Sequence, residues 1–414
     1  MATGEPGRAH PAATAAHPAA PTITRALTVL LAVACGAIAA NLYYAQPLIA
    51  LIAPSVGLGT VAASLVVTLT QIGYGVGLIL LVPLADMIEN RRLVIVTLSG
   101  TVVALAIAAV APGAGLFLFA ALLIGISSVA AQILIPMAAH MSPDAIRGRV
   151  VGNVMSGLLI GILLARPIAG VVADVMGWRA IFFLSALLMV GLLLVLAWRL
   201  PKWQPAPGPR YGQVLRSLGT LFRRNPLLRR RAAYQAAMFA AFSLFWTAVP
   251  LELASPRFGY SQSGIALFAL VGAAGALAAP LAGRVADRGW TRPATGGALA
   301  SVALAFAMAW AGGAAGSVVV LAAAGVLLDF GVQANMVLGQ RTIYALAPEA
   351  RGRLNGIYVA SAFAGGAVGS AIASGTFGQG GWSLVTLVGL GFPVAALLFY
   401  STELLRRRAA PRCA

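Results

Sequence analysis

Long apolar segments recur along the whole chain, separated by short polar stretches. A helix needs about 20 apolar residues to cross the hydrocarbon core of a bilayer, and the segments are of this length. Twelve of them can be delimited, at residues 23–50, 62–84, 93–110, 116–139, 150–173, 178–198, 232–253, 263–283, 294–311, 317–340, 354–377 and 382–400. The pattern therefore predicts an all-α integral membrane protein with twelve transmembrane helices.

The composition and charge agree with this, because 60% of the 414 residues are apolar and only 9% are charged. Of the 28 Lys and Arg residues, 25 lie on the predicted side that holds the N-terminus. Arg179 and Arg257 lie on the other side, and Arg166 lies within a helix. Because cationic residues collect in cytoplasmic loops, both termini are expected in the cytoplasm. No nucleic-acid partner is needed to explain the net charge of +18.

A polar stretch between the sixth and seventh segments divides the chain. It contains four prolines and then an arginine-rich amphipathic pattern, which predicts a stiff linker and a helix on the anionic cytoplasmic leaflet. We therefore expect a disordered cytoplasmic leader (1–22), a six-helix bundle (23–200), this linker (201–231), a second six-helix bundle (232–402) and a basic cytoplasmic tail (403–414).

The two predicted bundles repeat each other in sequence. The Gly-Trp pair at 177–178 recurs at 381–382 and the Arg-Gly-Arg triplet at 147–149 recurs at 351–353, both 204 residues later, and Asp86 recurs as Asp287. Parallel six-helix repeats are typical of secondary transporters, which bind their substrate near the midplane of the bilayer between the repeats. The sequence thus predicts two pseudosymmetric halves.

The sequence offers little for catalysis. The only lysine, Lys202, lies in the linker, so no Walker A motif is present. The three histidines, His10, His17 and His140, form no metal-binding pattern with Cys or acidic residues. We therefore expect no enzymatic activity, no cofactor and no bound metal.

The repeat, the loop VPLADMIENRR at 82–92 and its second copy GRVADR at 283–288 resemble the major facilitator superfamily. Within it the chain is most similar to twelve-helix proton-coupled drug and metabolite exporters of bacteria, including a group with a segment like NLYYAQPL, here at 41–48. The resemblance covers residues 23–404. It implies a multi-pass monomer in the bacterial inner (cytoplasmic) membrane, and a charge and helix-dipole latch of Asp86 and Arg91 at a cytoplasmic gate. With their repeated counterparts, the candidate gate residues are Asp86, Arg91, Arg147, Arg149, Asp287, Arg288, Arg351 and Arg353.

Two charged residues lie deep inside predicted helices, Arg166 in the fifth and Asp329 in the tenth. A charge at the bilayer centre costs about 2.5 to 3.5 kcal/mol on insertion scales, so such residues usually face a cavity or a partner. Exporters of this type carry an arginine in helix four, where this chain has Ala121, which leaves Arg166 as the cation able to act on a buried acid. We predict that Arg166 and Asp329 share a central cavity and serve substrate binding or proton coupling. A structural ion pair is the alternative.

Other polar side chains occur on helices 1, 4, 7 and 10, which line the cavity in the family. The candidates for substrate binding or proton coupling are Asn41, Tyr44, Gln46, Gln132, Gln333 and Asn335, with Tyr234, Gln235 and Trp246 as further cavity positions. The alternative for each is a hydrogen bond between helices.

Glycines concentrate in helices 2, 5, 8 and 11, at 73 and 77, 157 and 161, 272 and 275, and 365 and 369. Small residues let helix backbones approach closely. We expect these glycines to form the surfaces at which helix 2 crosses helix 11 and helix 5 crosses helix 8, between the two halves.

We interpret the chain as a secondary transporter, and the leading hypothesis is proton-coupled export of small organic molecules by alternating access. Its partners would be the small-molecule substrate, protons and the lipid bilayer. One alternative is proton-coupled uptake of an organic anion, with Arg166 binding a carboxylate. Another is a non-transporting membrane sensor on the same fold, which the short loops and tails disfavour.

Overall fold

A computed structural model describes residues 23–205, 210–347 and 350–408. Within these ranges the chain forms helices and connecting turns, without strands. The leader expected at 1–22 and the end of the expected tail, 409–414, lie outside the described residues. Residues 403–408 of that tail continue the last helix.

The first half holds eight α-helices and three 3₁₀ segments. The α-helices are α1 (Arg25–Ala40), α2 (Ile49–Ser55), α3 (Leu65–Leu80), α4 (Asn90–Val110), α5 (Ala114–Ser127), α6 (Ala130–His140), α7 (Asp144–Met176) and α8 (Trp178–Arg199), and the 3₁₀ segments are η1 (Gln46–Leu48), η2 (Thr60–Ala62) and η3 (Val82–Asp86). Turns at 41–45 interrupt the first crossing, between α1 and η1. Residues 128–129 separate α5 from α6 in the same way.

The linker helix α9 (Tyr211–Arg224) follows the first half. The second half consists of α10 (Pro226–Ala254), α11 (Gln262–Ala269), the 3₁₀ segment η4 (Leu270–Leu277), α12 (Ala278–Asp287), α13 (Thr291–Ala315), α14 (Val318–Tyr344) and α15 (Arg351–Arg408). The last of these comprises two arms, because the backbone leaves helical geometry at Gly380 and Gly381. Gly381 has φ of 59°, a left-handed value that glycine adopts without steric cost.

Nine helices of the described chain are long and apolar enough to cross a membrane. One of these covers both arms of α15. Two further crossings are interrupted and so consist of shorter pieces, α1 with α2 and α11 with α12. The described residues therefore make twelve crossings, and the all-α membrane fold predicted from the sequence is confirmed.

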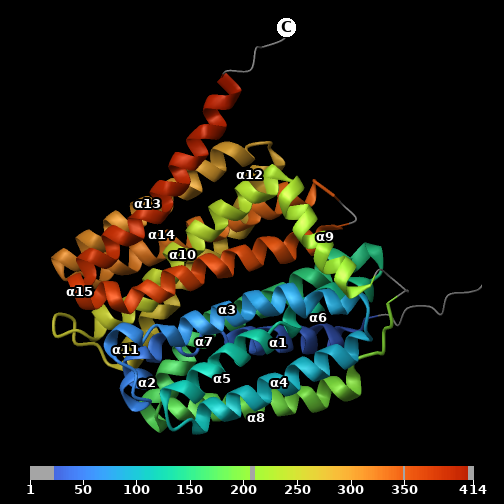
Figure 1. Ribbon diagram of the computed structural model, residues 1–414, viewed down its shortest axis with the longest axis horizontal. Coiled ribbons are helices and arrows are strands. Elements are labelled where there is room, and N and C mark those ends of the chain that lie inside the picture. The colour runs from blue at the N-terminus through green and yellow to red at the C-terminus, as the bar shows by residue number, and fades with distance from the viewer. Residues whose placement is uncertain (1–22, 206–209, 348–349, 409–414) are drawn as a thin grey trace, which may run out of the picture.

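Figure 1 shows the helices of the first half, from blue to green, below those of the second half, from yellow to red. Helix α9 lies at one end of the bundle, which we call the linker end, and α2 and α11 lie at the opposite end. The apolar face of α9 is turned to the protein, because Val214 and Leu218 are buried. Leu218 packs in a cluster with Leu354 and Ile357 of α15.

The halves meet along two helix pairs. Helix α3 lies against the first arm of α15, where the hydroxyl groups of Thr68 and Ser370 are 3.0 Å apart. Helix α7 meets α11, where the Asp174 carboxylate accepts hydrogen bonds from the backbone N–H and the hydroxyl group of Ser263. Asp174 and Ser263 lie at the opposite end of the bundle. Residues 145–149, at the linker end of α7, are exposed. The α7–α11 boundary is thus closed at the opposite end.

The glycines expected at these crossings lie mostly elsewhere. Gly161 of α7 faces the backbone of Gly36 on α1, and Gly369 of α15 faces the backbone of Ala240 on α10. These glycines bring together helices of the same half, so the prediction that they form the surface between the halves is wrong. Gly170, which was not among the glycines expected at the crossings, is the α7 glycine that packs against α11.

Candidate functional site

Arg166 lies on α7 at the centre of the bundle and is 4% exposed. Its Nε donates a hydrogen bond of 2.8 Å to the Gln46 side-chain oxygen. The guanidinium carbon lies 4.6 Å from the ring centre of Trp246, 5.0 Å from that of Tyr43 and 5.5 Å from that of Phe242. Aromatic faces carry partial negative charge and attract cations, so three rings and one amide hold this charge within the membrane.

Asp329 lies on α14, also buried. Its Oδ1 accepts a hydrogen bond of 2.8 Å from the indole Nε1 of Trp246. Glycines of η4 make room for the carboxylate, because a Cβ added at Gly272 or Gly275 would contact Asp329. Within the described chain no ion pair joins Asp329 to Arg166, although the two charges act on each other. The residues that the sequence expected to share a cavity are therefore linked through Trp246.

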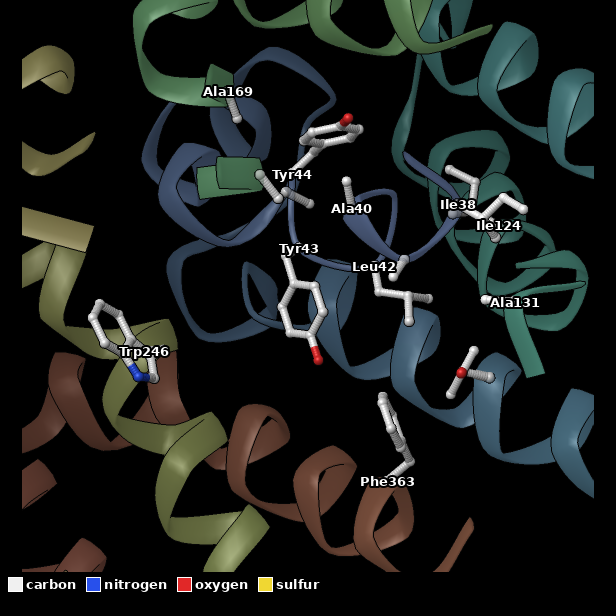
Figure 2. Packing of buried hydrophobic residues seen from close by; sticks show 14 of the residues in the cluster. Ile38, Ala40, Leu42, Tyr43, Tyr44, Ile124, Ala131, Ala169, Trp246 and Phe363 are labelled. Carbon is white, nitrogen blue, oxygen red and sulfur yellow. The ribbon is translucent and has the colours of Figure 1, made fainter. Parts of the chain in front are cut away.

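We call Tyr43, Gln46, Arg166, Phe242, Trp246 and Asp329 the central cluster. Figure 2 shows Tyr43 extending from the first half toward the helices that carry Trp246 and Phe363, while Tyr44 is directed away from Trp246. Both tyrosines lie in the turn at 41–45, between α1 and η1. Tyr43 joins the cluster although the sequence favoured Tyr44.

Two donors of the central cluster have no acceptor among the described residues. They are the Nη2 nitrogen of Arg166 and the amide Nε2 nitrogen of Gln46, and both are buried. A buried donor without a partner is costly, so native proteins usually satisfy such groups. The two nitrogens belong to side chains that already contact each other, and together they could receive an oxygen acceptor of a bound molecule.

Other predicted site residues bond to neighbouring helices. The Asn41 oxygen accepts from the Ser185 hydroxyl group of α8 at 2.6 Å. Gln132 donates to the Tyr74 hydroxyl group at 3.1 Å, and Asn335 donates to the oxygen of Gln235 at 2.7 Å. These contacts match the alternative role of helix-to-helix hydrogen bonds. Gln333 is half-buried, and Tyr44 is buried.

The candidate gate residues lie at the linker end, in separate contacts. Asp287 forms an ion pair of 2.5 Å with Arg341, which also donates to the Gly283 carbonyl oxygen. The sequence missed Arg341 as a partner, although its position in the last turn of the tenth helix was a usable signal. Asp86 is exposed, and no ion pair within the described chain joins it to Arg91.

The remaining candidate gate arginines contact different partners. Arg353 donates to the Ser217 hydroxyl group of α9 at 3.0 Å and is also the charged residue that acts most strongly on Asp86. Arg147 and Arg351 donate to backbone carbonyl oxygens at helix ends. Arg149 and Arg288 are exposed.

Comparison with known proteins identifies the family. Residues 29–323 match the model of the Major Facilitator Superfamily. The chain belongs to this superfamily. It is 40% identical over 389 residues to the uncharacterized transporter YgaY of Escherichia coli O157:H7, covering 94% of this chain and 98% of that protein. It is 34% identical over 361 residues to the probable transporter SCO4007 of Streptomyces coelicolor, covering 87% of this chain and 83% of that protein.

Solved structures share the fold at low identity. The nucleoside transporter NupG superimposes with a TM-score of 0.75 at 14% identity, covering 91% of this chain and 99% of that one. A D-xylose-proton symporter superimposes with a TM-score of 0.68 at 15% identity, covering 90% and 96%. Fold and relatives together make this chain a multi-pass membrane transporter of the major facilitator type.

Proposed function

We propose that this transporter exports small organic molecules in exchange for protons, by alternating access around the central cluster. The observation that carries the proposal is the burial of one cation and one acid, from different halves, in contact with the same indole ring. Ionisable groups inside a membrane usually mark a substrate or proton pathway, because burying them is costly. A buried carboxyl group also favours its neutral form, which lets it take up a proton near neutral pH.

In this cycle Asp329 carries the proton and Arg166 contacts the substrate. An ionised Asp329 holds Arg166 in the position in which it binds the substrate, and a protonated Asp329 lets Arg166 lose that position. The proton and the substrate therefore exclude each other, as an exchange of the two species requires. The same superfamily fold carries proton coupling in the D-xylose-proton symporter, which supports a proton as the coupling ion.

We propose that the protein is a monomer in the bacterial inner membrane, with both termini in the cytoplasm. The arginine-rich linker end would then be the cytoplasmic end. The functional halves would be residues 23–200 and 232–402, joined by the linker 201–231. The residues of the central cluster would bind substrate and proton, and the linker-end arginines and acids would form the cytoplasmic gate.

A second candidate is proton-coupled uptake of an organic anion. The two buried donors without an acceptor, on Arg166 and Gln46, favour it. A carboxylate could accept from both nitrogens at once, and charge-assisted hydrogen bonds of this kind are about twice as strong as neutral ones. This candidate uses the same site and differs in substrate and direction.

The test is a transport assay in everted membrane vesicles with an imposed pH gradient. A pH-sensitive dye reports proton movement when organic cations, neutral compounds or carboxylates are added one at a time. Asp329→Asn should abolish the dependence on the pH gradient while substrate binding stays measurable. Arg166→Ala should weaken binding by about 10- to 100-fold, as expected when a charged hydrogen bond is lost.

Matched controls exist for both changes. Glu252→Gln removes another buried acid, at the end of α10, and Arg231→Ala removes another buried arginine. Both control variants should keep proton-linked transport in proportion to the amount of folded protein. If Asp329→Asn and Arg166→Ala transport like the parent under the gradient, the coupling site lies elsewhere. Export and uptake differ in the direction in which the gradient drives substrate.

A further inference from the structure

Trp246 occupies an unusual position between the two buried charges. It comes from α10, is 2% exposed, and offers its ring face to Arg166 and its N–H to Asp329. We propose that Trp246 is the positioning residue that transmits the protonation state of Asp329 to Arg166. This inference rests on the proposed proton-coupled function, and it assigns to a neutral side chain the link that a direct ion pair would otherwise provide.

The two contacts use different parts of one rigid ring, so they are coupled mechanically and electronically. A carboxylate that accepts the indole N–H fixes the orientation of the ring plane, because the donor lies in that plane. The hydrogen bond also shifts electron density toward the faces of the ring, because a hydrogen bond in a low-dielectric interior polarises the groups that make it. A more negative face attracts the guanidinium more strongly. Ionised Asp329 therefore holds Arg166 through Trp246.

Protonation of Asp329 weakens both effects. A neutral carboxyl group is a poorer acceptor than a carboxylate, because charge-assisted hydrogen bonds are about twice as strong as neutral ones. The proton is added to the carboxylate from the side to which the site is open, and no other bond is made or broken. The Trp246 ring is then held by a weaker hydrogen bond, and its face carries less negative charge. Arg166 then loses the orientation in which it binds a substrate, so the proton and the substrate exclude each other.

The packing around Trp246 allows few other positions for the ring. Phe245 meets it edge-on with ring centres 5.5 Å apart, and Phe268 of α11 lies 6.1 Å away. On the remaining side a Cβ added at Gly272 would contact both Trp246 and Asp329. A ring confined in this way can reorient only between a few arrangements, which suits a two-state switch.

The charged and titratable groups that act on Asp329 come from two neighbouring elements. Arg166 of α7 is the cation, and the Tyr43 hydroxyl group of the 41–45 turn is the titratable neighbour. Helix α10 contributes the N–H of Trp246, and η4 contributes Gly272 and Gly275. Helix α13 packs against another face of α14, at Gly331. A pH response of Trp246 therefore reports on Asp329 in the field of Arg166.

The experiment follows the intrinsic fluorescence of the purified protein without substrate, titrated from about pH 5 to 9, where a buried carboxyl group can ionise. The parent should show a step in emission, and the step should be lost in Trp246→Phe, which removes the responding N–H. It should also be lost in Asp329→Asn, which retains all seven tryptophans. In vesicles, Trp246→Phe should lower proton-driven transport about tenfold.

Trp382→Phe is the matched control. Trp382 is buried and donates its indole N–H to the Ala309 carbonyl oxygen at 2.8 Å, so this variant loses a similar bond away from the cluster. It should keep both the fluorescence step and transport. A step that persists in Trp246→Phe, or no step in the parent, would overturn the inference. A step with the expected variant pattern, but no proton-driven transport of any compound, would instead contradict the proposed function and leave the switch standing.

Discussion

At the residue scale, Gln46 makes the burial of Arg166 tolerable. Within the described chain, the Gln46 side-chain oxygen is the hydrogen-bond acceptor of the Arg166 guanidinium. The other contacts of the guanidinium are with aromatic faces. A buried charge without an acceptor is much more costly than one with an acceptor. The pairing also orients Arg166, because a guanidinium held at Nε can present its terminal nitrogens in only one direction.

Gln46→Leu should therefore destabilise the protein although it introduces an apolar residue into a membrane. The expected loss is about 1 to 3 kcal/mol, the cost of leaving a buried polar group unsatisfied. Thermal unfolding of the detergent-purified protein measures it. Gln340→Leu is the control, since Gln340 is half-buried and bonds to Asn355 near the linker end. Equal unfolding temperatures for the two variants would contradict a supporting role of Gln46.

The sequence located the two deep charges but not the residue that links them. Arg166 and Asp329 were recognisable because each interrupts an apolar helix. Trp246 was recognisable only as one of several polar positions on its helix. Whether its ring points between the charges depends on the rotation of α10 relative to α7 and α14. An apolar helix surrounded by protein and lipid carries no clear polar face from which that rotation could be read.

At the scale of helices, the glycines determine how closely neighbours within each half approach. Gly161→Leu and Gly369→Leu would each drive a side chain into the backbone of an adjoining helix. Overpacking usually costs about 1 to 3 kcal/mol, and a backbone neighbour can yield less than a side chain. We expect less folded protein from both variants, measured by size-exclusion chromatography of a fluorescent fusion.

Gly191→Leu is the control for this prediction, because Gly191 is exposed on α8 and a Cβ there would meet open space. It should yield as much folded protein as the parent. If Gly161→Leu and Gly369→Leu fold normally but fail to transport, the glycines act in the conformational cycle. The packing within the halves would then be more tolerant than the backbone contacts indicate.

The interruptions within the helices were harder to predict from the sequence than the helices themselves. The span at 263–283 reads as one apolar stretch, yet it is built from α11, η4 and α12. Hydropathy records where the chain is apolar, not which hydrogen-bonding pattern its backbone uses. The turn at 41–45 went unnoticed for the same reason, and Tyr43, which joins the central cluster, lies in this turn.

At the scale of the whole molecule, the two halves hold each other most directly at the opposite end. Asp174 near the end of α7 caps the start of α11 through Ser263, and Gly170 allows the helices to approach one turn below. A carboxylate at a helix N-terminus is favourable, because it satisfies free N–H groups and the helix dipole. The contact therefore works as a closure that must open when the site is exposed to that side.

Joining Asp174 and Ser263 covalently should stop transport with the opposite end closed. The double variant Asp174→Cys with Ser263→Cys places two thiols where the parent side chains are in contact, so oxidation should form a disulfide. Of the two native cysteines, Cys35 is buried and should not compete, and Cys413 is replaced by Ser in the parent and in every variant. We expect the oxidised protein to lose substrate transport almost completely and a reducing agent to restore it. Each single cysteine variant, oxidised in parallel, should stay active. A cross-linked protein that still transports at the parental rate would mean that α7 and α11 do not separate during the cycle.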